Sequence, residues 1–342
     1  MFVRTNWEAA SYSSPGQAML ALLRRIHIEG ALPLIAVITL IAALTASPAP
    51  SPSAPAPAMS SPRPNADAQP EFILAEAELK AGNNEAAIHD FDQAIQLDPT
   101  FMASYLDRGN AEVRAGRLDD AIIDFSRVIK ADPNNATAYS DRGASYGQLG
   151  ENALALADLR RAQALDPKDA GNDYNLASVE AQSGDLKSAL SDMDRSIATA
   201  PSAFSYRGRA QIESALGDQT GAIRDMTSAI KVDAADPGLR AGRGLYYQRA
   251  HRYAAAVADF GAAIRLAPAV PQFRMMRAQT RVLAKDIPGA VADLRELRRM
   301  MVAANNKDAV NKLDQAINVL LAPSHAAATP KPHATPHPSK NV

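Results

Sequence analysis

Apolar, small and proline positions recur along the central part of the chain with a period of 34 residues. The strings FDQAIQLDP (91–99), FSRVIKADP (125–133) and LRRAQALDP (159–167) follow one another at this spacing. One residue is lost after Pro201, and the register then resumes. A unit of this length predicts two helices of about 13 residues joined by tight turns. The phased alanines are Ala87, Ala121, Ala155, Ala189, Ala222, Ala256 and Ala290.

Residue size at each phase predicts how the two helices of a unit pack. Gly109 and Gly143 fall where the first helix crosses the second, and small residues on both sides allow a close approach. Large residues such as Phe91 and Phe125 fill the gap to the next unit. The phased prolines end the second helix because they cannot continue it and restrict the residue before them. One unit alone cannot cover its apolar face, so stacked units are expected to form a solenoid.

This pattern resembles the tetratricopeptide repeat, a family of 34-residue helical hairpins. The resemblance runs from about Ala68 to Val302 and covers seven units, the last of them degenerate. It implies an all-α solenoid over residues 71–302. The segment 306–321 has apolar residues at helical spacing and a polar outer face, which predicts a C-terminal capping helix.

Two charged positions depart from the most familiar pattern of that family. An aspartate recurs in all seven units, and an arginine takes the place usually held by leucine in five of them, whereas Leu74 and Leu176 retain leucine. We expect these arginines and aspartates to pair between the first and second helices as a partly buried ladder. The alternative is separate solvated residues, each of which contributes little. The arginines are Arg108, Arg142, Arg209, Arg243 and Arg277, and the aspartates are Asp90, Asp124, Asp158, Asp192, Asp225, Asp259 and Asp293.

The N-terminal part of the chain carries an uncharged apolar segment at 31–46, with Arg24 and Arg25 before it. The positive-inside bias predicts a single-pass signal anchor in an inner membrane, with residues 1–30 in the cytoplasm and the repeats on the periplasmic side. A cleaved signal peptide, which would release the chain into the periplasm, and a soluble cytoplasmic protein are the alternatives. The Pro/Ala/Ser-rich segment 47–70 and the tail 322–342 are predicted to be disordered.

Composition narrows the chemistry that the chain can carry. The chain has 36 basic and 37 acidic residues, so its net charge of −1 gives no bulk attraction to nucleic acid. It has no cysteine, which excludes disulfides, thiolate metal sites and cysteine nucleophiles. Only 5% of the residues are aromatic, whereas 47% are hydrophobic, a balance that favours helices over sheets.

Motif matches do not add an enzyme to this interpretation. The string Gly143-Ala144-Ser145-Tyr146-Gly147 fits the nucleophile elbow of α/β-hydrolases, but that elbow needs a strand–turn–helix and the string falls within a repeat helix. The histidines form no metal-ligand motif, and the three in the tail fit a proline-rich segment better than a metal site. We therefore expect no catalysis, no cofactor, no metal site and no small-molecule substrate.

A binding surface remains, and the resemblance implies that it lies on the concave face lined by the first helices. Amide side chains there can contact the backbone of an extended peptide, and aromatic residues or methionine can act as apolar anchors. We predict a scaffold that binds a protein or peptide partner. A self-assembling structural protein and a regulatory subunit of an envelope enzyme are the alternatives. The candidate residues are Phe72, Leu106, Asn110, Arg114, Gln148, Tyr174, Gln182, Phe204, Arg207, Gln211, Gln248, Arg249, Met275 and Gln279.

Overall fold

The computed structural model describes residues 65–322. This range contains fifteen α-helices and no strand. The helices belong to two compact units, an N-terminal unit that ends at Phe273 and a C-terminal unit that begins at Arg274. Each unit is described by itself below.

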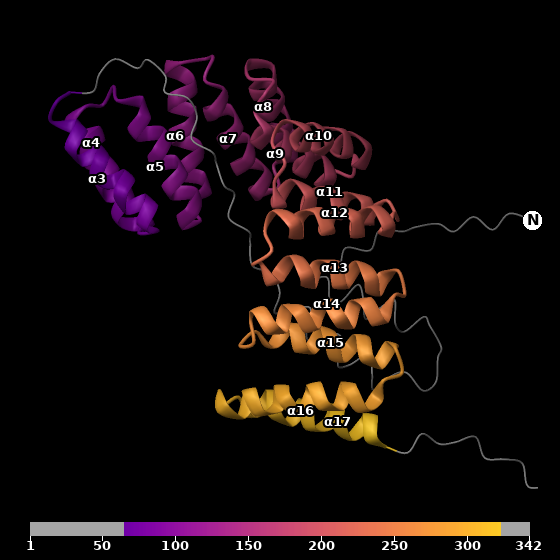
Figure 1. The fold of residues 1–342 in the computed structure, drawn as a ribbon. Coiled ribbons are helices and arrows are strands. Elements are labelled where there is room, and N and C mark those ends of the chain that lie inside the picture. The colour runs from indigo at the N-terminus through magenta and orange to yellow at the C-terminus, as the bar shows by residue number, and fades with distance from the viewer. Residues whose placement is uncertain (1–64, 323–342) are drawn as a thin grey trace, which may run out of the picture. The chain divides into compact units, whose positions relative to one another are not determined.

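The N-terminal unit is a row of six helical hairpins that follow one another in chain order (Figure 1). Each helix packs on the next along the chain, and consecutive first helices from α3 to α11 approach one another more closely than consecutive second helices do. The first helices therefore line the inner side of the stack. The hairpins are α3 (Ala68–Ala81) with α4 (Asn84–Leu97), α5 (Met102–Ala115) with α6 (Leu118–Ala131), α7 (Ala136–Leu149) with α8 (Asn152–Leu165), α9 (Ala170–Gln182) with α10 (Leu186–Thr199), α11 (Ala203–Ala215) with α12 (Gln219–Val232), and α13 (Pro237–Arg249) with α14 (Tyr253–Leu266).

The C-terminal unit holds the seventh hairpin, except for the first three residues of its first helix, and the last helix of the described chain. The hairpin consists of α15 (Pro271–Leu283) and α16 (Ile287–Ala303), and α17 (Lys307–Leu321) packs on α16. Leu294, Leu297, Leu313 and Ile317 are buried together in its core. Helix α17 occupies the segment for which the sequence predicts a capping helix.

Helix ends follow the turn chemistry of the sequence. The second helices α4, α6 and α8 each end one residue before an extended aspartate and then a proline, as at Asp98 with φ −141° and ψ 92°. Most first helices in the described range end at a glycine with positive φ, such as Gly82 at 84°. His251, Lys285 and Asn305 adopt the same left-handed conformation with φ of 56°, 63° and 53°, although side chains disfavour it.

The small residues predicted to lie at the helix crossing do lie there. A methyl group added at Gly109 would stand 2.6 Å from the Phe125 ring, and one added at Gly143 would stand 2.8 Å from Leu159. Phe91, Phe125 and Phe260 are fully buried. The close approach of the two helices therefore depends on glycine or alanine opposite a large residue.

The predicted arginine–aspartate ladder is confirmed. In five hairpins the arginine of the first helix donates through Nε and Nη2 to both carboxylate oxygens of the aspartate sixteen residues later, at 2.6–3.0 Å. Such two-point pairs are stronger and more directional than single contacts. The pairs are Arg108–Asp124, Arg142–Asp158, Arg209–Asp225, Arg243–Asp259 and Arg277–Asp293.

The third nitrogen of the guanidinium also reaches the preceding hairpin. In the N-terminal unit, Nη1 of Arg142 donates to Ser126 at 2.9 Å, and Nη1 of Arg243 donates to Thr227 at 3.0 Å. Arg108 contacts Asp92 in the same way, and Arg209 contacts Asp194 at 2.7 Å. One side chain therefore joins the second helices of two successive hairpins.

The fourth hairpin shows why its ladder position is leucine. The acceptor position of the preceding hairpin is occupied by Arg160, so an arginine at 176 would meet a like charge. Leu176 is buried there instead. Arg195 on α10 takes over the ionic contacts and donates to Asp173 at 2.8 Å and to Asp192 at 2.6 Å.

One predicted boundary is wrong. Helix α3 begins at Ala68, three residues inside the predicted linker 47–70, because Pro70 falls in the first turn, where a helix tolerates proline. The predicted membrane segment 31–46 and nearly all of the tail 322–342 lie outside the described residues. Among the helices that are described, none combines the length and apolar character that a membrane span requires.

Candidate functional site

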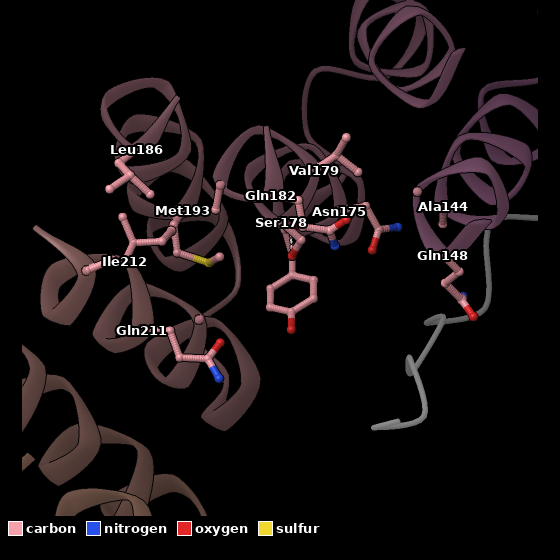
Figure 2. Close-up of a pocket in the computed structure, with 15 residues that line it drawn as sticks. Ala144, Gln148, Asn175, Ser178, Val179, Gln182, Leu186, Met193, Gln211 and Ile212 are labelled. Atoms are coloured by element: carbon pink, nitrogen blue, oxygen red, sulfur yellow. Dashed lines mark hydrogen bonds between the residues drawn. The ribbon is translucent and has the colours of Figure 1, made fainter. Parts of the chain in front are cut away.

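A groove opens on the inner side of the N-terminal unit, where three consecutive first helices meet. It has a volume of about 490 Å³ and is lined mainly by α7, α9 and α11, with Leu186 and Met193 from α10. Figure 2 shows Leu186, Met193 and Ile212 gathered on one side of the groove, and Gln148 on the opposite side. Gln211 lies beside Ile212, so amide side chains occur on both sides of the groove.

Glycine allows close packing beneath the groove. Gly208 on α11 lies so close to α10 and α9 that an added methyl group would stand 2.6 Å from Met193 Cε and 3.1 Å from the Tyr174 ring. At Gly147 on α7, an added methyl group would stand 2.8 Å from Val179. Met193 and Ile212 are almost fully buried beneath the groove, whereas Tyr174 is half-buried and lines it.

Four side-chain amides provide the polar part of the groove: Gln148, Asn175, Gln182 and Gln211. They come from three different helices, and within residues 65–322 no hydrogen bond engages any of their side chains. Each amide has two N–H donors and one carbonyl acceptor, which match the groups of a peptide backbone. The groove thus combines apolar surface with available donors and acceptors, as ligand sites commonly do.

Acidic side chains continue this inner face towards the N-terminus. Asp107 on α5 and Asp141 on α7 occupy the same repeat phase as Asn175 on α9. Burial, and then the charge of Glu76, raises the pKa of Asp107 to about 6. Burial raises the pKa of Asp141 to about 7, and Asn110, whose side chain lies within hydrogen-bonding reach, partly offsets this. Both carboxylates therefore gain from a positive charge placed next to them.

The groove brings together four of the fourteen residues predicted from the sequence: Gln148, Tyr174, Gln182 and Gln211. Three others, on the first two hairpins, pack against or bond to other parts of the protein. Phe72 packs against the rings of Phe91 and Phe101, with centroids 5.7 and 4.8 Å away. Leu106 packs against the core cluster of Tyr105, Val128 and Ala138, and Arg114 donates to the carbonyl of Leu79 at 3.3 Å.

The remaining predicted residues lie outside the groove. The Arg207 guanidinium stacks on the Phe204 ring at 5.1 Å. Arg249 donates to the Ser214 hydroxyl at 2.7 Å, and Gln248 on α13 is half-buried. In the C-terminal unit, Met275 packs against the core and Gln279 is half-buried. Asn110 lies beside Asp141.

Asn175, Leu186, Met193 and Ile212 line the groove, although they are not among the site residues predicted from the sequence. Met193 is 99% buried, yet it also contributes to the lining. The signal that could have found this place is the pair Gly147 and Gly208, because glycine on two of the first helices allows Val179 and Met193 to pack closely there.

The hydrolase-like string has no catalytic setting in this fold. It lies inside α7, and the Ser145 hydroxyl is buried and donates to the carbonyl of Asp141 at 2.8 Å. No cluster of three or more residues able to hold a metal ion occurs in the described part of the chain.

The fold and this groove define a helical-repeat protein with a binding surface on its inner side. The tetratricopeptide repeat profile matches residues 74–136, 140–204 and 241–309, more than half of the chain. The chain therefore belongs to the tetratricopeptide repeat family. The comparison with curated proteins found no match.

Solved structures agree with this fold. A tetratricopeptide repeat protein of Parabacteroides merdae is 19% identical with a TM-score of 0.54, over 74% of this chain and 100% of that chain. PilF of Pseudomonas aeruginosa is 12% identical with a TM-score of 0.51, over 63% of this chain and 97% of that chain. At these identities the likeness shows the fold alone.

Proposed function

We propose that this protein is a non-catalytic scaffold that binds an extended segment of a partner protein in the groove between α7, α9 and α11. The observation that carries this proposal is the set of four unbonded amides beside the half-buried apolar side chains of Tyr174 and Leu186. An extended peptide, for example in the polyproline II conformation, presents free N–H and C=O groups along its length and side chains that project outward. The amides can bond to the backbone groups of the peptide, and the apolar surface can contact its side chains.

The size of the groove fits one anchoring residue. A volume of about 490 Å³ is enough for one large apolar side chain with its flanking backbone, and it lies within the usual range of ligand sites. Because the first helices follow one another in a row, a longer segment can run along the inner face across several of them. Affinity is then expected to depend mainly on the anchor, as in other interfaces.

A photo-crosslinking experiment tests this function. A photoreactive residue is placed at Gln182 in the groove or at Gln93, an exposed position on α4, in the full chain. The segment crosslinked from position 182 is identified by mass spectrometry and synthesised. We expect this peptide to bind the wild-type chain and to lose at least about ten-fold in affinity with Tyr174→Ala, at unchanged helicity.

Two results would contradict the proposal. One is the same set of crosslinked segments from positions 182 and 93, which would mean that no segment binds specifically in the groove. The other is equal affinity of the peptide for the wild-type chain and for Tyr174→Ala.

We further propose that residues 31–46 tether the scaffold to the bacterial inner membrane, with the repeats on the periplasmic side. The support is the uncharged apolar segment preceded by Arg24 and Arg25. Protease added to spheroplasts is expected to degrade the repeats of a chain that fractionates with the membrane. Repeats that stay protected until the cells are lysed would contradict this orientation, and a chain released into the periplasmic fraction would contradict the tether.

A further inference from the structure

Asp107 and Asp141 lie at the repeat positions that lead from the groove towards the N-terminus. The three equivalent positions on α5, α7 and α9 are Asp107, Asp141 and Asn175, and Asn175 lines the groove itself. Consecutive first helices contact each other in this part of the stack. A segment that leaves the groove towards the N-terminus therefore passes two carboxylates in succession.

Neither carboxylate is in contact with a basic side chain. No arginine or lysine in the described range forms an ion pair with Asp107 or Asp141, because the neighbouring ladder arginines, Arg108 and Arg142, are engaged elsewhere. The charges of Lys80 and Arg114 act on Asp107 without forming an ion pair and partly offset the rise of its pKa. One oxygen of Asp141 is buried without a hydrogen-bond partner. Desolvated carboxylates that lack a cation in contact are the complement of a basic ligand.

The repeat geometry sets the positions of the basic residues in that ligand. Packed helices lie about 10 Å apart, and a chain in the extended polyproline II conformation advances about 3.1 Å per residue, so about three residues separate neighbouring first helices. Such a chain has three residues per turn, so side chains three and six residues from the anchor face the same way as the anchor does. A peptide side chain that faces Asp141 is therefore about three residues along the peptide from the one that contacts Tyr174. A peptide side chain that faces Asp107 is about six residues from it.

We propose that the partner segment is basic and apolar: one large apolar side chain against Tyr174, and lysine or arginine about three and about six residues away, facing Asp141 and Asp107. This inference rests on the proposed function of the groove and adds the chemical class of the partner. The occupant of the groove is a segment of another protein.

Labelled peptides of known sequence test the inference by fluorescence anisotropy with the full chain. Three peptides of about 15 residues share one central leucine and carry lysine, glutamine or glutamate about three and about six residues from it on both sides, so that either chain direction is covered. We expect the lysine peptide to bind at least about ten-fold more tightly than the glutamate peptide at low salt, with a smaller difference at high salt.

A matched pair of variants locates the effect. Asp107→Asn with Asp141→Asn is expected to abolish the preference for lysine. Asp119→Asn with Asp120→Asn removes the same charge from exposed positions on α6 and is expected to keep the preference. Equal binding of all three peptides, or a preference that survives in the first variant, would overturn the inference.

The remaining outcomes separate this inference from the proposed function. If all three peptides bind equally and Tyr174→Ala weakens all of them, the groove binds peptides and only the basic partner is wrong. If none binds and sedimentation shows a dimer that Tyr174→Ala dissociates, the occupant is a second copy and both proposals fail. If Lys331→Glu with Lys340→Glu strengthens binding of the lysine peptide, the chain's own tail competes for the groove, and the commitment to a partner protein is wrong.

Discussion

The Arg142–Asp158 pair tests whether the guanidinium bridge stabilises neighbouring hairpins. Arg142 donates to the two oxygens of Asp158 at 2.7 and 2.9 Å and to Ser126 of the preceding hairpin at 2.9 Å. The side chains of Arg142 and Asp158 are only 19% and 11% exposed. Arg142→Leu would leave the Asp158 carboxylate without its partner. Leucine fits the position, because Leu176 occupies it in the next hairpin.

The burial of the pair sets the expected magnitude. Breaking a buried ion pair by removing one partner costs about 3–5 kcal/mol, and the residual exposure of this pair places Arg142→Leu near the lower end, at about 3 kcal/mol. Replacing both partners by apolar residues is often close to neutral. We therefore expect Arg142→Leu with Asp158→Leu to lie within about 1 kcal/mol of the wild type, which gives a coupling energy of at least about 2 kcal/mol.

Hydrogen exchange measured by mass spectrometry suits a repeat protein, because its stability is largely a sum of neighbouring units. A loss of about 3 kcal/mol corresponds to more than about 100-fold faster exchange in α7 and α8, since about 1.4 kcal/mol is ten-fold. Helices α13 and α14 act as an internal reference and should change little. The double variant is compared with Arg142→Leu alone and Asp158→Leu alone. If the loss of stability in the double variant equals the sum of the losses in the two single variants, Arg142 and Asp158 are not coupled and the bridge is refuted.

Three further predictions concern the turns, the buried carboxylates and the groove. Lys285 has φ of 63°, so Lys285→Gly should stabilise the chain by about 1 kcal/mol in urea unfolding. Gly150→Ala should destabilise it by a similar amount. A lower urea midpoint for Lys285→Gly would contradict the idea that the left-handed conformation is strained at Lys285. Burial, and then the charge of Asp124, raises the pKa of Glu112 to about 8 from its ordinary 4.5. The folded chain therefore holds an extra proton between these values, and stability should fall as the pH rises through this window; Glu112→Gln should reduce this pH dependence, and an unchanged profile would count against it. Gly208→Ala should push Met193 into the groove, weaken peptide binding several-fold and cost about 1–3 kcal/mol; binding unchanged from the wild type would exclude that contact.

The periodic features of the fold could be predicted because each follows from residue type at one phase. A glycine opposite Phe125 signals a close helix crossing, and a proline after Asp98 signals a helix end. The ladder was also predictable, since arginine and aspartate recur in phase. Its extension to Ser126 of the preceding hairpin was not, because that acceptor changes between aspartate, serine and threonine along the chain.

The groove was only partly predictable. Repeat phase placed Tyr174 and Gln182 on the inner face, and both line the groove. Phase alone cannot show that Phe72 packs against Phe101, or that Arg249 bonds to Ser214, because these contacts depend on irregular neighbours. The close packing of Val179 and Met193 beneath the groove depends on glycine at 147 and 208, which a search for chemical groups overlooks.

The most direct measurement of the central claim is the affinity of the crosslinked partner peptide for a chain whose groove has been filled. Gln182→Trp places a large ring in the groove from an exposed position, and Gln93→Trp makes the same change on α4. The account predicts at least about a ten-fold loss of affinity for Gln182→Trp and wild-type affinity for Gln93→Trp. Equal affinities for the two variants would show that the segment binds elsewhere.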